Sequence, residues 1–255
     1  MKKKEDNKKI NYFKFVWIAG IFAILILVLV IVIEYKVYYE QAINYIYFYD
    51  CNNSVCYTNK KNNIQKTTIY SKYEYEGTIP RVEILSNNLT IINDNTLYNY
   101  ITGSLITKDY DEYIEISNYL IVSKNNLYGV IDSTGKIVLP ISHKSITSND
   151  GIYFTTSIDK INYNLIDINN NTILDNYDYI YEYNNVVVTV KDMKVSIKDI
   201  DGNDLIGREL EVYDKDRLIN VTNNNNILYI RIYKNDKYYK YSYDINDKNL
   251  EPMST

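Results

Sequence analysis

Two cysteines are the residues of this chain whose type and spacing most directly predict chemistry. Cys51 and Cys56 are its only cysteines, and they enclose the short run Asn-Asn-Ser-Val. On the oxidising side of a membrane, such a pair predicts a disulfide, whereas in a reducing compartment it would remain two free thiols. No second cysteine pair or histidine cluster completes a zinc ligand set. The disulfide candidate is therefore Cys51–Cys56, and no metal or cofactor is predicted.

The histidine and carboxylate residues give no recognisable catalytic set. His143 is the single histidine, and it follows Pro140 in an expected turn without a partner for Ser-His-Asp or Cys-His chemistry. The 32 Asp and Glu residues leave one enzymatic alternative. It is a glycosidase-like pair of carboxylates about 5–9.5 Å apart on a propeller scaffold. No catalytic or cofactor-binding residue is assigned, and the chain is not expected to be an enzyme.

One acidic run resembles a calcium loop. It reads Asp-Ile-Asp-Gly-Asn-Asp over residues 199–204. Calcium loops of the EF-hand kind place Gly sixth and Glu twelfth, whereas here Gly202 is fourth and Leu210 is twelfth. A tight turn explains the same residues, and similar runs recur without the extra acids. Calcium is therefore not predicted.

An uncharged run near the N-terminus predicts a membrane span. Residues 15–33 read FVWIAGIFAILILVLVIVI, and as a helix they would be about 28 Å long, close to the hydrocarbon thickness of a bilayer. Six lysines precede the run, so the N-terminus is expected inside and the rest of the chain outside. A cleaved signal peptide is the alternative, but its apolar core is usually shorter and no small-x-small site follows here.

Net charge excludes one class of partner. The formal charge is −4, and the tail that is expected inside is basic. The outer part is therefore more acidic still, which argues against nucleic acid as a partner. The 30 tyrosines are explained by strand surfaces, although aromatic platforms for carbohydrate would also use them.

A short pattern recurs along the rest of the chain. Aspartate is followed three residues later by Gly, Asn or Asp, with apolar residues on both sides. An aspartate can accept a hydrogen bond from the backbone two residues on, and the later position suits a left-handed residue. This combination is typical of tight β-hairpins. The four pairs are Asp132 with Gly135, Asp167 with Asn170, Asp199 with Gly202, and Asp244 with Asp247.

The flanks of these turns read as strands. Apolar and β-branched runs surround each turn, and a further run such as Val186–Val190 precedes it. The unit is therefore a meander of three or four strands in about 32 to 45 residues, a period typical of propellers, solenoids or arrays. Six units are expected to start near residues 46, 76, 115, 148, 181 and 217.

One unit carries a family resemblance. Residues 126–140 read NLYGVIDSTGKIVLP. They resemble the bacterial WG repeat, which has an aromatic residue before Gly, an apolar-x-Asp-x-x-Gly-Lys turn and an apolar strand that ends at Pro. Here the aromatic residue is Tyr128 rather than Trp, and the turn part recurs in the units at 163, 195 and 240. The resemblance implies a surface or envelope-associated β-repeat protein, and it implies no chemistry.

These patterns predict an all-β repeat domain that follows one transmembrane helix. A propeller-like arrangement is favoured, because closure leaves no long sheet edge, and an open β-solenoid or stack is the alternative. The predicted function is a single-pass, membrane-anchored binding or scaffold protein with a protein or cell-envelope partner. The expected segments are a basic cytoplasmic tail at 1–14, the span at 15–33, a juxtamembrane linker at 34–45 and the extracytoplasmic repeat domain at 46–255.

Overall fold

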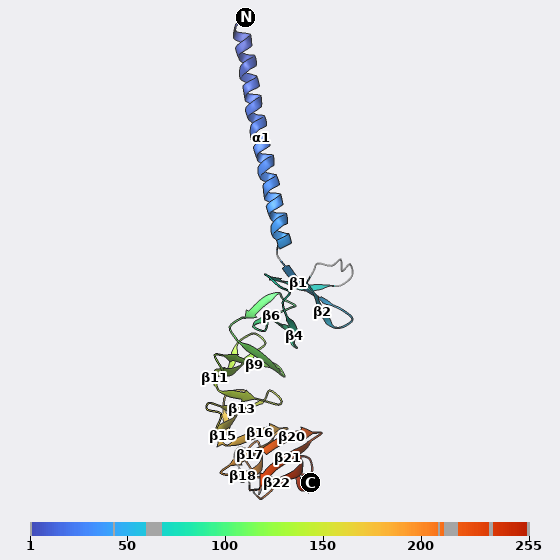
Figure 1. The fold of residues 1–255 in the computed structure, drawn as a ribbon, viewed down its shortest axis with the longest axis vertical. Coiled ribbons are helices and arrows are strands. Elements are labelled where there is room, and N and C mark those ends of the chain that lie inside the picture. Colours follow the sequence, from blue (N-terminus) through green and yellow to red (C-terminus); the bar gives the residue numbers. More distant parts are fainter. Residues whose placement is uncertain are drawn as a thin grey trace. The chain divides into compact units, whose positions relative to one another are not determined.

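The computed structural model describes residues 2–42, 44–59, 68–208, 210–211, 219–234 and 237–253. Within these residues, one helix precedes strands that form six antiparallel sheets (Figure 1). The chain separates into two compact units. The first comprises residues 1–80 with 101–103, and the second comprises residues 81–100 with 104–255.

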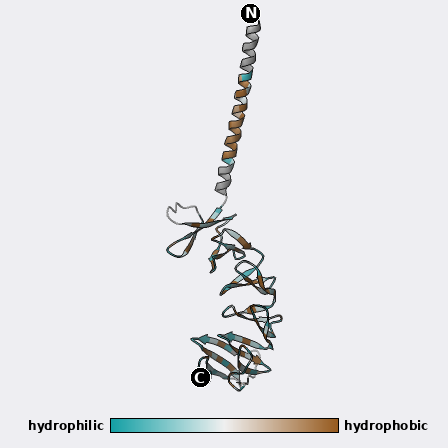
Figure 2. Ribbon diagram, turned by 180° about the vertical axis from the view of Figure 1, so that it is seen from behind, coloured by the Kyte–Doolittle hydropathy of each residue, from teal (hydrophilic) through white to brown (hydrophobic). Residues whose placement is uncertain are grey.

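Helix α1 (Lys2–Ala42) is longer than the sequence predicts. Within its segment Lys14–Tyr35, an 18-residue stretch has a mean hydropathy of 3.3, and none of the residues of that stretch is buried. The segment is the brown part of the helix in Figure 2. This segment is long and apolar enough to cross a membrane, a property that signal sequences share. The linker expected at 34–45 is helical up to Ala42, because no Gly or Pro interrupts it.

The first sheet differs from the other five. Its strand order is β2-β1-β3, so the first strand lies in the middle instead of at an edge. Ile46 and Phe48 of β1 are fully buried. The three strands are β1 (Asn44–Asp50), β2 (Val55–Thr58) and β3 (Ile69–Tyr75).

The remaining five sheets share one topology, in which four strands lie side by side in the order of the sequence. The second sheet contains β4 (Val82–Ile84), β5 (Leu89–Ile92), β6 (Thr96–Asn99) and β7 (Ser104–Thr107). The third contains β8 (Glu112–Ile116), β9 (Tyr119–Lys124), β10 (Leu127–Asp132) and β11 (Ile137–His143). The fourth contains β12 (Ser145–Thr147), β13 (Tyr153–Ser157), β14 (Tyr163–Asp167) and β15 (Thr172–Tyr177). The fifth contains β16 (Tyr179–Tyr183), β17 (Val186–Lys191), β18 (Lys194–Asp199) and β19 (Leu210–Glu211). The sixth contains β20 (Ile219–Asn224), β21 (Ile227–Lys234), β22 (Lys237–Asp244) and β23 (Asn249–Met253).

The prediction of an all-β, propeller-like repeat domain is confirmed, with six antiparallel sheets of which five are four-stranded meanders. The sheets begin at residues 44, 82, 112, 145, 179 and 219, and the largest difference from an expected start is six residues, in the second sheet. The up-and-down order of each four-stranded sheet is the order of a propeller blade.

The cores of the second unit lie between consecutive sheets. On β9, Leu120 and Val122 pack toward the second sheet, and Ile121 between them packs toward the fourth. On β17, Val187 packs toward the fourth sheet and Val188 toward the sixth. Successive side chains of a strand point to opposite faces, so these middle strands are apolar on both sides.

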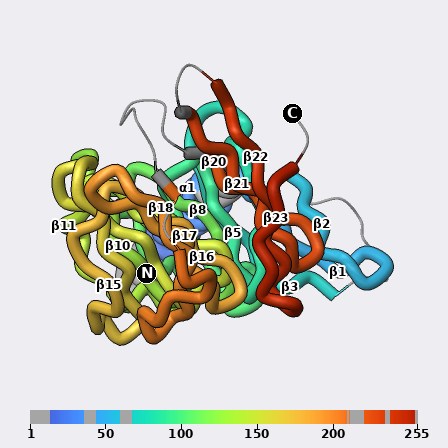
Figure 3. Tube along the Cα trace, turned by 90° about the horizontal axis from the view of Figure 1, so that it is seen from below, coloured from blue at the N-terminus to red at the C-terminus, as the bar shows by residue number. Residues whose placement is uncertain are grey.

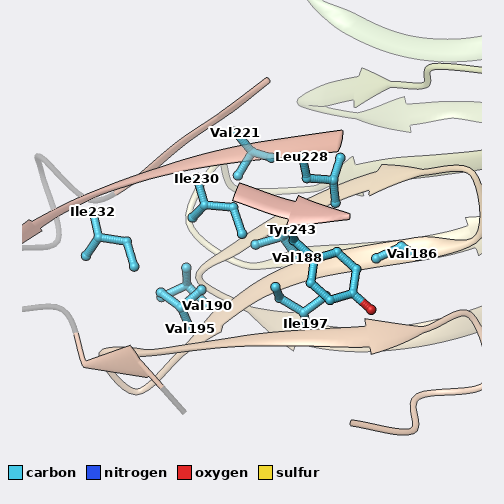
Figure 4. Packing of buried hydrophobic residues seen from close by; sticks show 10 residues of the cluster. All are labelled: Val186, Val188, Val190, Val195, Ile197, Val221, Leu228, Ile230, Ile232 and Tyr243. Atoms are coloured by element: carbon cyan, nitrogen blue, oxygen red, sulfur yellow. The ribbon is translucent and has the colours of Figure 1, made fainter. Parts of the chain in front are cut away.

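The largest of these cores joins the fifth and sixth sheets. Its side chains interdigitate from β17 and β18 on one side and from β20, β21 and β22 on the other (Figure 4). Tyr243 is the largest fully buried residue in it. The cluster consists of Val186, Val188, Val190, Val195, Ile197, Val221, Leu228, Ile230, Ile232 and Tyr243.

The face of the sixth sheet that turns away from this core is polar. Thr222, Arg231 and Lys240 are exposed there, and the Arg231 guanidinium lies 5.0 Å from the ring centre of Tyr238. The four strands of this sheet are the adjacent red strands in Figure 3. A polar outer face is typical of a terminal repeat, which covers the core without needing a further neighbour.

Three of the four predicted turns share one geometry. Gly135, Asn170 and Gly202 have φ values of 86°, 65° and 87°. Each donates its backbone N–H to the carbonyl of the aspartate three residues earlier, at 3.0 Å. The Asp167 carboxylate also accepts the backbone N–H of Asn169 at 2.9 Å and of Asn171 at 2.7 Å.

The fourth turn is different. Asp244 pairs with Asn249, so this hairpin loop is one residue longer, and its left-handed residue is Lys248 with φ 52° instead of Asp247. The expectation that Asp247 occupies the left-handed position is therefore wrong. Asp244 still accepts the backbone N–H of Asn246 at 2.8 Å and of Asp247 at 3.2 Å.

Many of the other hairpins turn on asparagine pairs at positive φ. Such pairs with φ between 45° and 65° are Asn52–Asn53, Asn87–Asn88, Asn125–Asn126, Asn184–Asn185 and Asn225–Asn226. Two successive left-handed residues define the type I′ turn, whose twist matches that of the flanking strands.

The turn geometry predicts that Gly135→Val destabilises the protein by about 1–3 kcal/mol. Valine is strained at this positive φ, and its Cβ would lie 2.7 Å from Ile106 Cγ2. Thermal melts of the full chain in detergent measure the effect. Lys136→Val is the matched control, because Lys136 is exposed and has no positive φ. Equal melting temperatures for the two variants would contradict this account of the turn.

Candidate functional site

The two cysteines lie in the first hairpin. Their sulfur atoms are bonded, and their Cα atoms are 5.9 Å apart. Between them, Cys51 and Ser54 exchange backbone hydrogen bonds of 2.8 and 3.2 Å around the Asn52–Asn53 turn. The disulfide therefore links two residues that the hairpin already holds close together.

The carboxylates of the turn aspartates accept hydrogen bonds from residues of their own loops. Hydrogen bonds from Asn171 lower the pKa of Asp167, and those from Asn203 lower the pKa of Asp199. In the part of the chain that the structure describes, no three His, Cys, Asp or Glu residues gather as a metal site would require. These carboxylates therefore organise turns.

His143 lies on β11 and is partly buried. Neither of its ring nitrogens has a hydrogen-bond partner among the described residues, and burial lowers its pKa. No hydroxyl or thiol among the described residues is hydrogen-bonded to this ring, as activation of a nucleophile would require.

The sequence reasoning missed the pocket that the fold forms between its fourth and fifth sheets. The pocket has a volume of about 300 Å³. It is lined by aromatic and uncharged polar residues with a single carboxylic acid, and by no lysine or arginine among the described residues. The lining residues are Thr147, Ser148, Asn149, Tyr153, Thr155, Tyr163, Tyr179, Ile180, Tyr181 and Glu182.

Strand alternation determines which side chains face this pocket. Tyr153 and Tyr163 of the fourth sheet pack on the core that lies between the two sheets. Ile180 of β16 belongs to the same core, and Glu182 is two residues further on, so its side chain lies on the same face. The intervening tyrosines of β16 pack on the opposite core, toward the sixth sheet.

Glu182 is the chemically unusual residue of the pocket. Only 4% of its surface is exposed. Its Oε1 accepts the backbone N–H of Asn185 at 3.1 Å, and its Oε2 has no hydrogen-bond partner among the described residues. Burial, followed by the nearby charge of Asp150, raises the pKa of Glu182 to about 7. The carboxyl is therefore partly protonated near neutral pH.

The loop from β12 to β13 closes one side of the pocket. The side-chain amide of Asn149 donates to the backbone carbonyl of Glu182, which ties this loop to β16. Asp150 accepts the backbone N–H groups of Ile152 at 2.7 Å and Tyr153 at 3.2 Å. Both bonds go to Oδ1 of Asp150, which is not among the residues that line the pocket.

An equivalent glutamate in the third sheet makes a different contact. Glu115 occupies the same hairpin position on β8 as Glu182 on β16, because Glu115 pairs with Leu120 and Glu182 with Val187. Glu115 is exposed, and its Oε1 accepts both the backbone N–H and the hydroxyl of Ser86 from the preceding sheet. Glu182 has no such partner.

Comparison with known proteins gives matches among solved structures and none by sequence. No protein-family model matches the sequence, and comparison with curated proteins gives no match. Among solved structures, KlHsv2 with loop 6CD replaced by a Gly-Ser linker has a TM-score of 0.42 and 9% identity, covering 76% of this chain and 74% of that chain. Kluyveromyces lactis Hsv2 has a TM-score of 0.38 and 11% identity, covering 64% and 58%. HIRA(644-1017) has a TM-score of 0.35 and 8% identity, covering 55% and 54%.

The buried carboxyl predicts a pH dependence of stability. Because the folded state raises the pKa of Glu182 from 4.5 to about 7, it holds this proton more tightly than the unfolded chain. The stabilisation is complete below about pH 4.5 and is lost as the pH rises through about 7. Glu182→Gln should therefore raise the stability at about pH 8 by about 1–3 kcal/mol and leave it little changed at about pH 5.

Melts of the wild type and the variant at both pH values measure this difference. Glu115→Gln is the matched control, since Glu115 is exposed at the equivalent strand position, and its pH dependence should follow the wild type. The prediction would be contradicted if the melting temperatures of Glu182→Gln and the wild type differed by the same amount at both pH values.

Proposed function

We propose that the chain is a single-pass membrane protein whose β-repeat domain lies outside the cytoplasm and binds a protein or cell-envelope partner. The observation that carries the proposal is the helix segment Lys14–Tyr35, which is strongly apolar and unburied by the rest of the protein. Such a surface is stable in lipid and costly in water. The lysines before it favour an inside N-terminus.

The β-repeat domain is proposed to belong with the WG repeats. Its Tyr128-Gly129 pair has a structural reason that supports this. A Cβ on Gly129 would lie 2.9 Å from the Ile141 backbone, so only glycine allows β11 to approach here. Tyr163-Asn164 occupies the corresponding place in the fourth sheet, where the pairing also shifts register. There the Asn164 side chain accepts the backbone N–H of Asn176 at 2.9 Å.

A binding role is favoured over the glycosidase-like alternative. That reaction needs two carboxyl groups that both face the substrate. Glu182 has one unpartnered oxygen and is the single carboxylic acid among the described residues that line the pocket, whereas the neighbouring Asp150 does not line it. The pocket thus offers one carboxyl beside tyrosines, an arrangement that recognises a ligand without a second group to complete hydrolysis.

Protease added to intact cells tests the topology. The expected result is digestion of the β-repeat domain, with a small protected fragment that contains the N-terminal tail and the span. Permeabilised cells serve as the control, in which the tail is digested as well. Full protection of the domain in intact cells would reverse the proposed orientation, and a mature protein that lacks the first residues would show a cleaved signal sequence instead.

The same location predicts that the Cys51–Cys56 bond is present in the protein taken from cells. Mass spectrometry of unreduced protein should show a mass about two hydrogens lower than that of the reduced protein. Alkylation before reduction should leave both residues unmodified. Two freely alkylated thiols in the native protein would contradict the oxidising location.

A further inference from the structure

We propose that the pocket between the fourth and fifth sheets binds an alkylammonium group, with the Glu182 carboxylate as its counter-ion. This assignment rests on the proposed binding function and names the chemical class of its ligand. The shared chemistry is a primary ammonium on an alkyl chain, as in a small free amine or in a lysine side chain of a partner protein.

The strongest observation is the state of Glu182 itself. A buried carboxylate is normally paired or fully hydrogen-bonded, because desolvation of a charge is costly. Glu182 is 4% exposed, yet its Oε2 has no partner among the described residues and no basic side chain lines the pocket. An ammonium group would supply the missing hydrogen bonds and the missing charge together.

The surroundings of Glu182 select for positive charge. Asp150 from the β12–β13 loop adds negative charge to that of Glu182, and Tyr153 and Tyr163 face it from β13 and β14. Burial raises the pKa of Tyr153, and so do the charges of Glu182, Asp150, Asp201 and Asp167. Tyr153 therefore remains neutral. The rings of both tyrosines offer π faces that attract cations.

The dimensions agree with an alkylammonium ligand. A pocket of about 300 Å³ has room for about ten molecules the size of water, which exceeds the terminal part of a lysine side chain. The apolar wall formed by Ile180 and the tyrosine rings suits the alkyl carbons. Thr147 also lines the pocket, and its hydroxyl oxygen can accept one of the remaining ammonium hydrogens. The Ser148 hydroxyl is engaged in its own loop, because it donates to the Tyr153 carbonyl and accepts the Gly151 N–H.

The repeat itself argues against a purely structural role for Glu182. At the equivalent position, Glu115 joins its sheet to the preceding one through Ser86. Between the fourth and fifth sheets, the Asn149 side chain makes that link by donating to the backbone carbonyl of Glu182. The Glu182 carboxylate is therefore not needed to join the two sheets.

Calorimetric titration of the full chain in detergent with n-butylammonium chloride tests the proposal, with sodium chloride matching the ionic strength. At about pH 8, the expected Kd is about 1–10 mM, as suits so small a ligand. Glu182→Gln should weaken binding at least about tenfold, since it keeps the shape and removes the charge. Glu115→Gln should bind like the wild type, and neutral n-butanol should not compete.

Two further arms sharpen the result. Butylammonium stays charged at both pH values, so binding should be about tenfold tighter at about pH 8 than at about pH 6, as Glu182 ionises. A blocked lysine derivative is compared with its Nε-acetylated form, which carries no charge. Tighter binding of the lysine derivative than of butylammonium points to a protein side chain as the ligand, and equal binding points to free amines.

Equal affinity of wild type and Glu182→Gln, equal competition by n-butanol, or absence of binding by both amines would overturn the proposal. Thermal melts show whether each variant is folded. If Glu182→Gln does not fold, the comparison of wild-type binding at about pH 6 and pH 8 tests the proposal in its place. Because these titrations use detergent-solubilised protein, they do not depend on membrane orientation. A failed protease-protection result and a failed amine titration are therefore distinguishable.

Discussion

The second unit depends on one constraint: the middle strands of its sheets are apolar on both faces. Val187 and Val188 are neighbours in sequence, yet each needs a different adjacent sheet to exclude water from its side chain. A single four-stranded meander has no interior of its own, so burial is achieved only when consecutive sheets pack together. The stability of this unit is accordingly a property of the interfaces between repeats more than of any repeat alone.

This arrangement explains why a pocket forms where it does. Glu182 lies on the same face of β16 as Ile180 and faces the fourth sheet, where Ile180 belongs to an apolar core. A polar residue there interrupts close packing and leaves space beside the tyrosines of the fourth sheet. Hydrogen bonds from Asn185 to the carboxylate and from Asn149 to the backbone carbonyl offset only part of the desolvation.

Local features were predictable from sequence, and long-range ones were not. The Asp132–Gly135 turn and its copies identified the meanders, because an Asp carboxylate and a left-handed residue determine a hairpin within five positions. The longer hairpin after Asp244 kept the same residue types and shifted the left-handed position by one residue. Helix α1 exceeded its predicted bounds because apolarity defines a membrane segment and does not define where helical hydrogen bonding ends. The pocket could not be predicted, because the sequence does not show which face of β16 meets the fourth sheet. The run Tyr-Ile-Tyr-Glu-Tyr does show an isolated acid among apolar residues. Residues 149 and 182, however, come together only in the folded chain.

The asparagine pairs of the hairpins have a consequence at the level of the gene. The chain has only 8 glycines, yet its tight turns require many residues with positive φ, and asparagine is the side chain that tolerates this region best after glycine. Glycine codons all begin with two guanines, whereas asparagine codons begin with two adenines. A coding sequence poor in guanine and cytosine can therefore specify type I′ hairpins without glycine. The high asparagine content of the chain then has a structural role, because it encodes strand reversals with codons that are poor in guanine and cytosine.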